Sequence, residues 1–252
     1  MARLVTLITG ASAGLGAEFA RQCAARGEAL ALVARRRDRL EALKAALGGD
    51  VHIFEADLSR AGAAAGLIAE LEAEGLQVDT LINNAGFGLA GRLQVQSLDR
   101  LVEMIDLNCR TLTELCHLVL PGMSERGRGA ILNVASTAAF QPGPNMAVYY
   151  ATKAYVLSFT EALHHEMKGS GIKVSALCPG PTHSEFSDVA DSHSPTLERM
   201  KMPAAPVVEA GLAGLDANKA VVIPGFRNKI GAQASRLLTR AAMRRIIGRI
   251  KV

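Results

Sequence analysis

The chain has 252 residues, 49% of them hydrophobic, and a formal net charge of +4. This length and apolar content predict one α/β domain with a large buried core. No apolar run reaches the roughly 18 residues of a membrane-spanning helix. Residues 1–9 lack the small-residue cleavage site of a signal peptide, so a soluble, cytoplasmic protein is expected.

Strands and helices alternate through most of the chain. Apolar runs and helical spacing of apolar residues predict strands at 3–9, 29–34, 51–55, 80–82, 130–134, 172–177 and 220–223, and helices at 14–26, 37–47, 62–74, 97–125 and 148–169. Such alternation with short connections implies parallel strands joined by right-handed crossovers. The prediction is a single-domain Rossmann fold: a doubly wound, seven-stranded parallel sheet with helices on both faces.

One long segment, residues 184–206, shows no clear periodicity and contains three prolines. In a compact domain such a segment is usually a binding lid or loop. We therefore expect it to form a substrate lid.

The cysteines and histidines do not indicate a metal site. The cysteines have neither the paired spacing of metal ligands nor the density of a disulfide-bonded secreted fold, and the six histidines form no zinc-type pair beside a carboxylate. Cys23, Cys109, Cys116 and Cys178 are expected to be reduced and mostly buried.

A glycine-rich loop follows the first predicted strand and opens the first predicted helix. Its glycines allow a tight turn and a close approach to a pyrophosphate, and the first helical turn offers unpaired amides and a positive dipole end. This placement favours dinucleotide binding over a plain tight turn. The expected contacts are Gly10, Ser12, Ala13, Gly14, Leu15 and Gly16.

Basic residues end the second predicted strand. An acidic residue here normally binds the ribose 2′-hydroxyl of NAD, whereas an arginine accommodates the 2′-phosphate of NADP. Arg35 and Arg36 precede the first carboxylate, Asp38, and a guanidinium is well shaped to grip phosphate. The alternative, a solvated helix start, suits basic residues poorly because of the helix dipole. NADP is therefore the expected cofactor, and NAD is less favoured.

Five features together resemble the signature set of the classical short-chain dehydrogenase/reductase family. They are residues 9–16, residues 83–86, Ser136, Tyr149 with Lys153, and Pro179 with Gly180. Their order and spacing match the family over about residues 3–225. The resemblance implies hydride transfer between a nicotinamide cofactor and a carbonyl or secondary alcohol, catalysed by Asn108, Ser136, Tyr149 and Lys153. Ser136 would hold the substrate oxygen, and Asn108 would anchor a water that relays protons to the lysine.

The resemblance also implies the remaining cofactor contacts. Two residues after the third strand would contact adenine, the segment after the fourth strand would line adenine and ribose, and a later loop would lie beside the nicotinamide. In chain order these residues are Asp57, Leu58, Asn84, Ala85, Gly86, Pro179, Gly180, Thr182 and Ser184. The family commonly has threonine where Ser184 stands, and the hydroxyl is retained.

Tyrosine, with a pKa of ~10, is too weak a base at neutral pH unless its phenolate is stabilised. Tyr149 and Lys153 are four residues apart, on one face of a predicted helix. An ammonium ~4 Å away at an effective dielectric of ~20 would stabilise the phenolate by at most about 4 kcal/mol. Tyr149, with its pKa lowered by the Lys153 ammonium, is thus predicted to be the general acid/base. Both side chains are also expected to contact the cofactor. Tyr150 lacks such a lysine.

The sequence does not identify the small-molecule substrate. Candidates for an apolar pocket, with ordinary core positions as the alternative, are Phe87, Phe140, Phe186, Met200 and Met202. The family resemblance implies a homodimer or homotetramer formed through the long central helices.

Excess positive charge is concentrated at the C-terminus. Nine of the 28 Lys and Arg residues follow Asp216, and none of the 24 acidic residues does. An apolar stripe runs through this basic segment at Met243, Ile246, Ile247 and Ile250. Residues 226–252 are thus predicted to be an amphipathic helical extension of a catalytic domain at 1–225. It would pack on the body, join subunits or lie on an anionic membrane; without a matching motif, no nucleic-acid binding is expected.

Two other classes of function stay open. One is a non-catalytic dinucleotide-binding sensor, which the presence of all four catalytic residue types disfavours. The other is a peripheral membrane protein that acts through its basic helix.

Overall fold

A seven-stranded parallel sheet organises the chain, and the computed structural model describes residues 2–192 and 198–249. The strands are β1 (Arg3–Thr9), β2 (Leu30–Ala34), β3 (Val51–Glu55), β4 (Leu76–Asn83), β5 (Gly129–Val134), β6 (Ile172–Leu177) and β7 (Val221–Val222). Their order is β3-β2-β1-β4-β5-β6-β7. The winding reverses between β1 and β4, and dinucleotides bind at the carboxyl ends of strands at such a point. The predicted Rossmann fold is confirmed.

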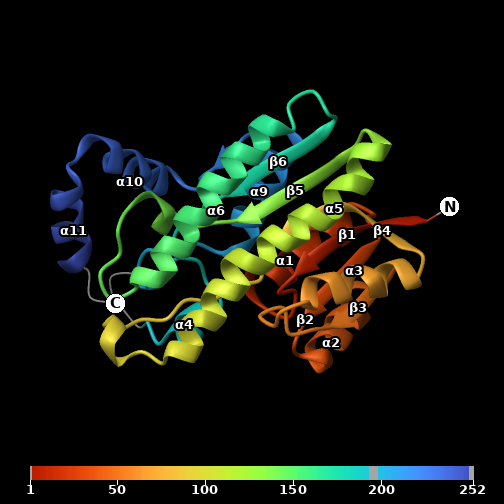
Figure 1. The fold of residues 1–252 in the computed structure, drawn as a ribbon, viewed down its shortest axis with the longest axis horizontal. Coiled ribbons are helices and arrows are strands. Elements are labelled where there is room, and N and C mark those ends of the chain that lie inside the picture. Colours follow the sequence, from red (N-terminus) through yellow and green to blue (C-terminus); the bar gives the residue numbers. More distant parts are fainter. Residues whose placement is uncertain (1, 193–197, 250–252) are drawn as a thin grey trace.

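Helices cover both faces of the sheet. One face carries α3 (Ala63–Ala73), α5 (Leu112–Arg126) and α6 (Ala147–Glu166), and the other carries α1 (Gly14–Ala25), α2 (Arg37–Leu47) and α9 (Ala204–Asp216). Figure 1 shows α5 and α6 in front of the sheet and α1 and α9 behind it. Strand side chains alternate between the two faces of the sheet. Leu7 therefore packs in the core beneath α3, α5 and α6, and Ile8 packs in the core beneath α1, α2 and α9.

The long helix predicted at 97–125 is interrupted. It consists of α4 (Leu98–Ile105), a π-helical turn η2 (Asp106–Thr111) and α5. Such turns occur mostly as single-turn insertions in α-helices and are frequent at functional sites. Here the turn contains Asn108, which is 1% exposed.

The segment predicted as a lid contains helical structure, and its role as a lid stays a prediction. Residues 184–206 include α7 (Phe186–Ala190) and the beginning of α9, while residues 193–197 lie outside the described part. Helix α9 was missed, although Val207, Val208, Leu212 and Leu215 are all buried and have helical spacing. The prolines near its start concealed this pattern. Strand β4 also begins earlier than predicted, since Leu76 already pairs with Arg3 of β1.

The C-terminal extension forms two helices, α10 (Phe226–Leu237) and α11 (Arg240–Arg249), beyond the carboxyl end of the sheet (Figure 1). Met243 and Ile247 are only 5% and 8% exposed. Of the three roles considered for the apolar stripe, the described residues therefore show packing on the body of the protein. Ile246 is exposed, and Ile250 lies outside the described residues. The division into a domain and an extension stays a prediction.

The four cysteines are free thiols, three of them buried and Cys109 half-buried, as expected. Within the described ranges, the helices lack the length and apolar character needed to cross a membrane. The cytoplasmic location stays a prediction.

Candidate active site

The glycine-rich loop is tied to the segment that follows β4. The Asn84 side-chain amide donates to the carbonyls of Thr9, at 2.9 Å, and Gly10, at 3.3 Å. The Thr9 hydroxyl accepts from the amides of Asn84 and Ala85, each at 3.0 Å. A Cβ on Gly16 would lie 2.1 Å from the Gly10 carbonyl oxygen, so only glycine lets α1 begin this close to the loop. The predicted loop residues therefore form one rigid unit.

The first turn of α1 is suited to an anion. Its N-cap is Ala13, whose side chain makes no capping hydrogen bond. The first amides of the helix are therefore free to bind a phosphate, and the helix dipole favours negative charge there.

Arg36 lies beside this loop. Its guanidinium donates to the Ser12 hydroxyl through Nε at 3.2 Å and Nη2 at 3.0 Å, and to Glu185 through Nη1 at 2.8 Å. Glu185 also pairs with Arg39, three residues further along α2. Arg39 was not predicted as a site residue, because a single arginine on a helix surface carries no distinctive sequence pattern.

Arg35 points elsewhere. Its Nη1 lies 3.3 Å from Glu103 of α4, and its side chain is 62% exposed. Arg36 is therefore better placed than Arg35 to meet a phosphate beside Ser12. On the same side, Asp57 accepts hydrogen bonds from the Ser59 hydroxyl and amide at 2.7 and 3.2 Å, and Leu58 is buried.

Four candidate catalytic residues lie at the carboxyl ends of β4 and β5. Tyr149 and Lys153 lie one turn apart on α6, Ser136 precedes η3 (Thr137–Phe140), and Asn108 lies in η2. The Lys153 ammonium donates to the Val134 carbonyl at 2.8 Å. The structure thus brings together elements more than 40 residues apart in the chain, as the hydrogen bond between Asn108 and Thr152 illustrates.

Asn108 is held on three sides. Its amide nitrogen donates to the Phe87 carbonyl at 2.9 Å and the Thr152 hydroxyl at 3.0 Å, and its oxygen accepts from the Phe87 amide at 3.1 Å. A Cβ on Gly86 would lie 2.8 Å from the Asn108 oxygen and 3.5 Å from the Lys153 ammonium. These two polar groups therefore border the same small space.

Burial controls the ionisation of the central pair. It raises the pKa of Tyr149 to about 12, with a hydrogen bond to Ser136 acting in the opposite direction. It lowers the pKa of Lys153 to about 8. The ammonium is 6.0 Å from the centre of the tyrosine ring. Lys153 was expected to lower the pKa of Tyr149, but burial has the largest effect and raises it instead.

An apolar wall adjoins Tyr149. The Phe186 ring is 5.2 Å from the Tyr149 ring, and Phe87 packs in the same cluster. A Cβ on Gly88 would lie 2.7 Å from the Phe186 ring and 3.1 Å from both Met146 and Tyr149. Gly88 and Met146 were missed, since a glycine and a methionine in a loop show no periodicity.

The other three candidates for the substrate pocket lie apart from this cluster. Phe140 packs against the core beneath α6, Met202 packs against the core on the opposite face, and Met200 is 44% exposed.

The loop after β6 is held by the C-terminal extension. The Thr182 hydroxyl donates to the Gly180 carbonyl at 3.0 Å, and Ser184 accepts from the Phe186 amide at 3.3 Å. A Cβ on Gly180 would lie 2.4 Å from the Asn228 side chain of α10. Asn228 was missed because the extension was treated as separate from the site.

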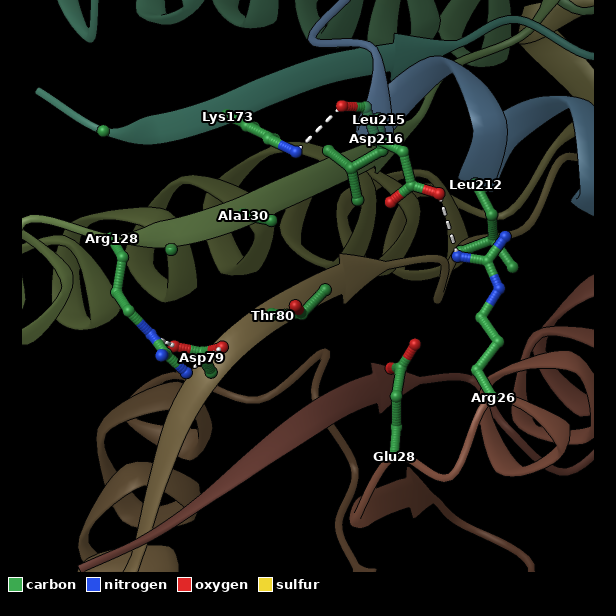
Figure 2. Close-up of a pocket in the computed structure, with 12 residues that line it drawn as sticks. Arg26, Glu28, Asp79, Thr80, Arg128, Ala130, Lys173, Leu212, Leu215 and Asp216 are labelled. Carbon is green, nitrogen blue, oxygen red and sulfur yellow. Dashed lines mark hydrogen bonds and ion pairs between the residues drawn. The ribbon is translucent and has the colours of Figure 1, made fainter. Parts of the chain in front are cut away.

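A second hollow, of about 250 Å³, opens at the amino ends of the strands (Figure 2). Two ion pairs cross its lining: Arg26 pairs with Asp216 at 3.1 Å, and Arg128 pairs with Asp79 at 3.0 Å. Lys173 donates to the Asp216 carbonyl at 2.8 Å. This hollow lies on the edge opposite the glycine loop and takes no part in the site.

The fold and this arrangement define a nucleotide-binding oxidoreductase of the Rossmann type. The chain belongs to the short chain dehydrogenase family, whose model matches residues 4–194. The predicted family and enzyme class are confirmed.

Similar proteins differ in their substrates. The chain is 36% identical to an NADP-dependent 3-hydroxy acid dehydrogenase, YdfG, of Escherichia coli O157:H7, over 74% of this chain and 76% of the relative. It is 40% identical to a sulfoacetaldehyde reductase of Chromohalobacter salexigens, over 71% of this chain and 73% of the relative.

Solved structures agree on the fold. A short-chain dehydrogenase from Sphingobium yanoikuyae in complex with NADPH superposes with a TM-score of 0.83 at 35% identity, covering 98% of this chain and 96% of that one. A 7beta-hydroxysteroid dehydrogenase gives a TM-score of 0.87 at 28% identity, with coverage of 98% and 96%.

Proposed function

We propose that this protein is an NADP-dependent oxidoreductase that interconverts a carbonyl compound and a secondary alcohol, with Tyr149 as the general acid/base. The observation that carries the proposal is the convergence of Tyr149, Lys153, Ser136 and Asn108 at the carboxyl end of β5, beside a rigid glycine loop.

In the reductive direction, NADPH, when bound, would supply the hydride that the carbonyl carbon accepts. The Ser136 hydroxyl orients the substrate oxygen, and Tyr149 donates its phenolic proton to that oxygen as negative charge develops there. A phenol with a pKa of about 12 is fully protonated at neutral pH, so it is ready to donate. The Lys153 ammonium returns a proton to the phenolate and regains one from solvent. Asn108, which borders the same space, would hold the water that carries this proton.

NADP fits the residues at the end of β2. Arg36 and Ser12 form a site for an anion next to the glycine loop, and neither carries the negative charge that would repel a 2′-phosphate. The names of the YdfG relative and of the NADPH-bound neighbour agree with this choice.

The wall formed by Phe87, Met146 and Phe186 favours a substrate with an apolar body next to its carbonyl group. Hydroxysteroids and bulky ketones fit this wall better than small charged aldehydes. A screen of NADPH oxidation should therefore compare steroid ketones and aryl ketones with 3-oxo acids and sulfoacetaldehyde.

A second copy of this chain is the proposed partner. An apolar hollow of about 400 Å³ lies between η1 (Leu93–Val95), η2 and α6, and its lining includes Leu93, Ile105 and Val148. Leu98 and Val102 on α4 are also exposed. Covering this face in a homodimer, or in a homotetramer built from it, would remove a continuous apolar surface from water.

The test of catalysis is a pair of matched variants. Tyr149→Phe removes the proton donor and should reduce turnover by about 10²- to 10⁴-fold, with NADPH affinity nearly unchanged. Tyr150→Phe removes a neighbouring hydroxyl and should retain turnover. Retained activity in Tyr149→Phe would refute the acid/base role. Tight NADPH binding without turnover on any carbonyl would instead favour the sensor alternative.

A further inference from the structure

The carboxylate of Glu185 is held by two arginines from the other side of the site. Arg36 donates to one carboxylate oxygen at 2.8 Å, and Arg39 pairs with the other. The two arginines hold the pKa of Glu185 below its usual range, so the group is ionised at neutral pH. An anion of the chain itself thus lies between Arg36, which is expected to meet the cofactor, and Arg39.

Glu185 reaches this position across the glycine loop. It belongs to the segment that follows β6, whereas Arg36 and Arg39 follow β2. The adjacent Ser184 lies against the loop, because a Cβ on Gly14 would be 2.9 Å from the Ser184 Cβ. The ion pairs therefore connect the segment that follows β6 with the residues that follow β2.

A 2′-phosphate and a carboxylate compete for the same donors. Both are oxygen anions that guanidinium groups bind through paired N–H donors. On Arg36, Nε and Nη2 already donate to Ser12, and Nη1 donates to Glu185. A phosphate bound beside Ser12 would also lie close to the Glu185 carboxylate, and two adjacent anions repel each other.

We propose that Glu185 is a built-in competitor for the 2′-phosphate of NADP, which occupies Arg36 and Arg39 until the phosphate displaces it. The inference rests on the proposed NADP dependence and adds a determinant of cofactor affinity. NADP has to displace the carboxylate, whereas NAD has no phosphate to do so.

Displacement of Glu185 also affects the catalytic end of the site. Phe186 is the next residue, and its ring is 5.2 Å from that of Tyr149. The amide of Val189 donates to the Glu185 carbonyl at 3.0 Å, which ties α7 to the same residue. Release of Glu185 by the phosphate would therefore loosen α7 next to Tyr149.

The test measures binding of cofactor fragments by isothermal titration calorimetry. The fragments 2′,5′-ADP and 5′-AMP differ only in the 2′-phosphate. Glu185→Gln keeps the size of the side chain and removes its charge. From the modest strength of exposed ion pairs, we expect binding of 2′,5′-ADP to become about three- to tenfold tighter in this variant. Binding of 5′-AMP should change less than about twofold.

Glu41→Gln is the matched control. Glu41 pairs with Arg37 at 2.9 Å on the exposed face of α2, so the variant makes the same change in net charge, on the helix that carries Arg39. Its affinity for 2′,5′-ADP should remain within about twofold of the wild-type value. An equal gain in both variants would show a general charge effect and would overturn the competitor role.

Hydrogen exchange supplies a second readout. Adding 2′,5′-ADP to the wild-type protein should speed amide exchange in residues 186–190, and 5′-AMP should not. Slower or unchanged exchange with 2′,5′-ADP would overturn the proposal. Weaker or unchanged binding of 2′,5′-ADP in Glu185→Gln would overturn it as well. If the wild-type protein does not prefer 2′,5′-ADP to 5′-AMP, the NADP assignment fails, and the competitor role fails with it.

Discussion

Lys153 has a cost in stability that can be measured as a function of pH. Burial lowers its pKa from 10.5 to about 8 in the folded chain. With about 1.4 kcal/mol for each pKa unit, keeping the buried ammonium charged at pH 7 costs the folded state about 3 kcal/mol. Lys153→Met removes this cost, together with the hydrogen bond to the Val134 carbonyl.

The sign follows from proton binding. Between pH 8 and pH 10.5 the unfolded chain keeps the lysine proton and the folded chain has lost it, so wild-type stability rises with pH in this window. Below pH 8 the full penalty applies. Relative to Lys153→Met, the wild-type free energy of unfolding should therefore rise by about 2–3 kcal/mol between pH 7 and pH 10. The lost hydrogen bond adds an offset that is nearly independent of pH.

Urea unfolding followed by circular dichroism, without cofactor, measures this difference. Other titrating groups, Tyr149 among them, are present in both proteins and largely cancel. A gap between the two proteins that stays constant from pH 7 to pH 10 would refute the assigned burial of the ammonium.

Three further predictions concern cofactor choice, substrate geometry and assembly. Arg36→Ala should reduce the preference for NADPH over NADH by about 10- to 100-fold, since a charge-assisted hydrogen bond to the 2′-phosphate is lost. Arg35→Ala should reduce this preference less. Equal effects of the two variants in steady-state kinetics would contradict the placement of Arg36 beside Ser12. Gly88→Ala forces a Cβ to within 2.7 Å of Phe186 and should reduce turnover by about 10- to 100-fold, while calorimetry shows unchanged binding of 2′,5′-ADP. Ile105→Glu introduces a charge on the apolar hollow and should yield monomers in analytical ultracentrifugation; an unchanged oligomer would place the subunit interface elsewhere.

Local patterns predicted much of the fold. The glycine loop, the apolar strands and the amphipathic helices are each recognisable within a few residues, because strand and helix periodicities are local properties. Helix α9 carried the same information in Val207, Val208, Leu212 and Leu215, but neighbouring prolines suggested a loop. The π turn η2 was not predicted, since residues 97–125 were expected to form one continuous helix.

The site was only partly predictable. The spacing of Tyr149 and Lys153 placed them on one helix face, but the sign of the pKa change in Tyr149 depends on how completely the fold removes water from the ring. Likewise, Arg36 and Glu185 are separated by 149 positions, and no local pattern indicates that they meet.

The amino-acid sequence alone thus determined most of the order of strands and helices, the glycine-rich loop and the chemical types of the candidate catalytic residues. The tertiary structure decided which arginine faces the loop, which aromatic rings adjoin Tyr149, and which charges are buried. The reason is physical: secondary structure follows from neighbouring residues, whereas desolvation and ion pairing depend on segments that meet only after the chain has folded.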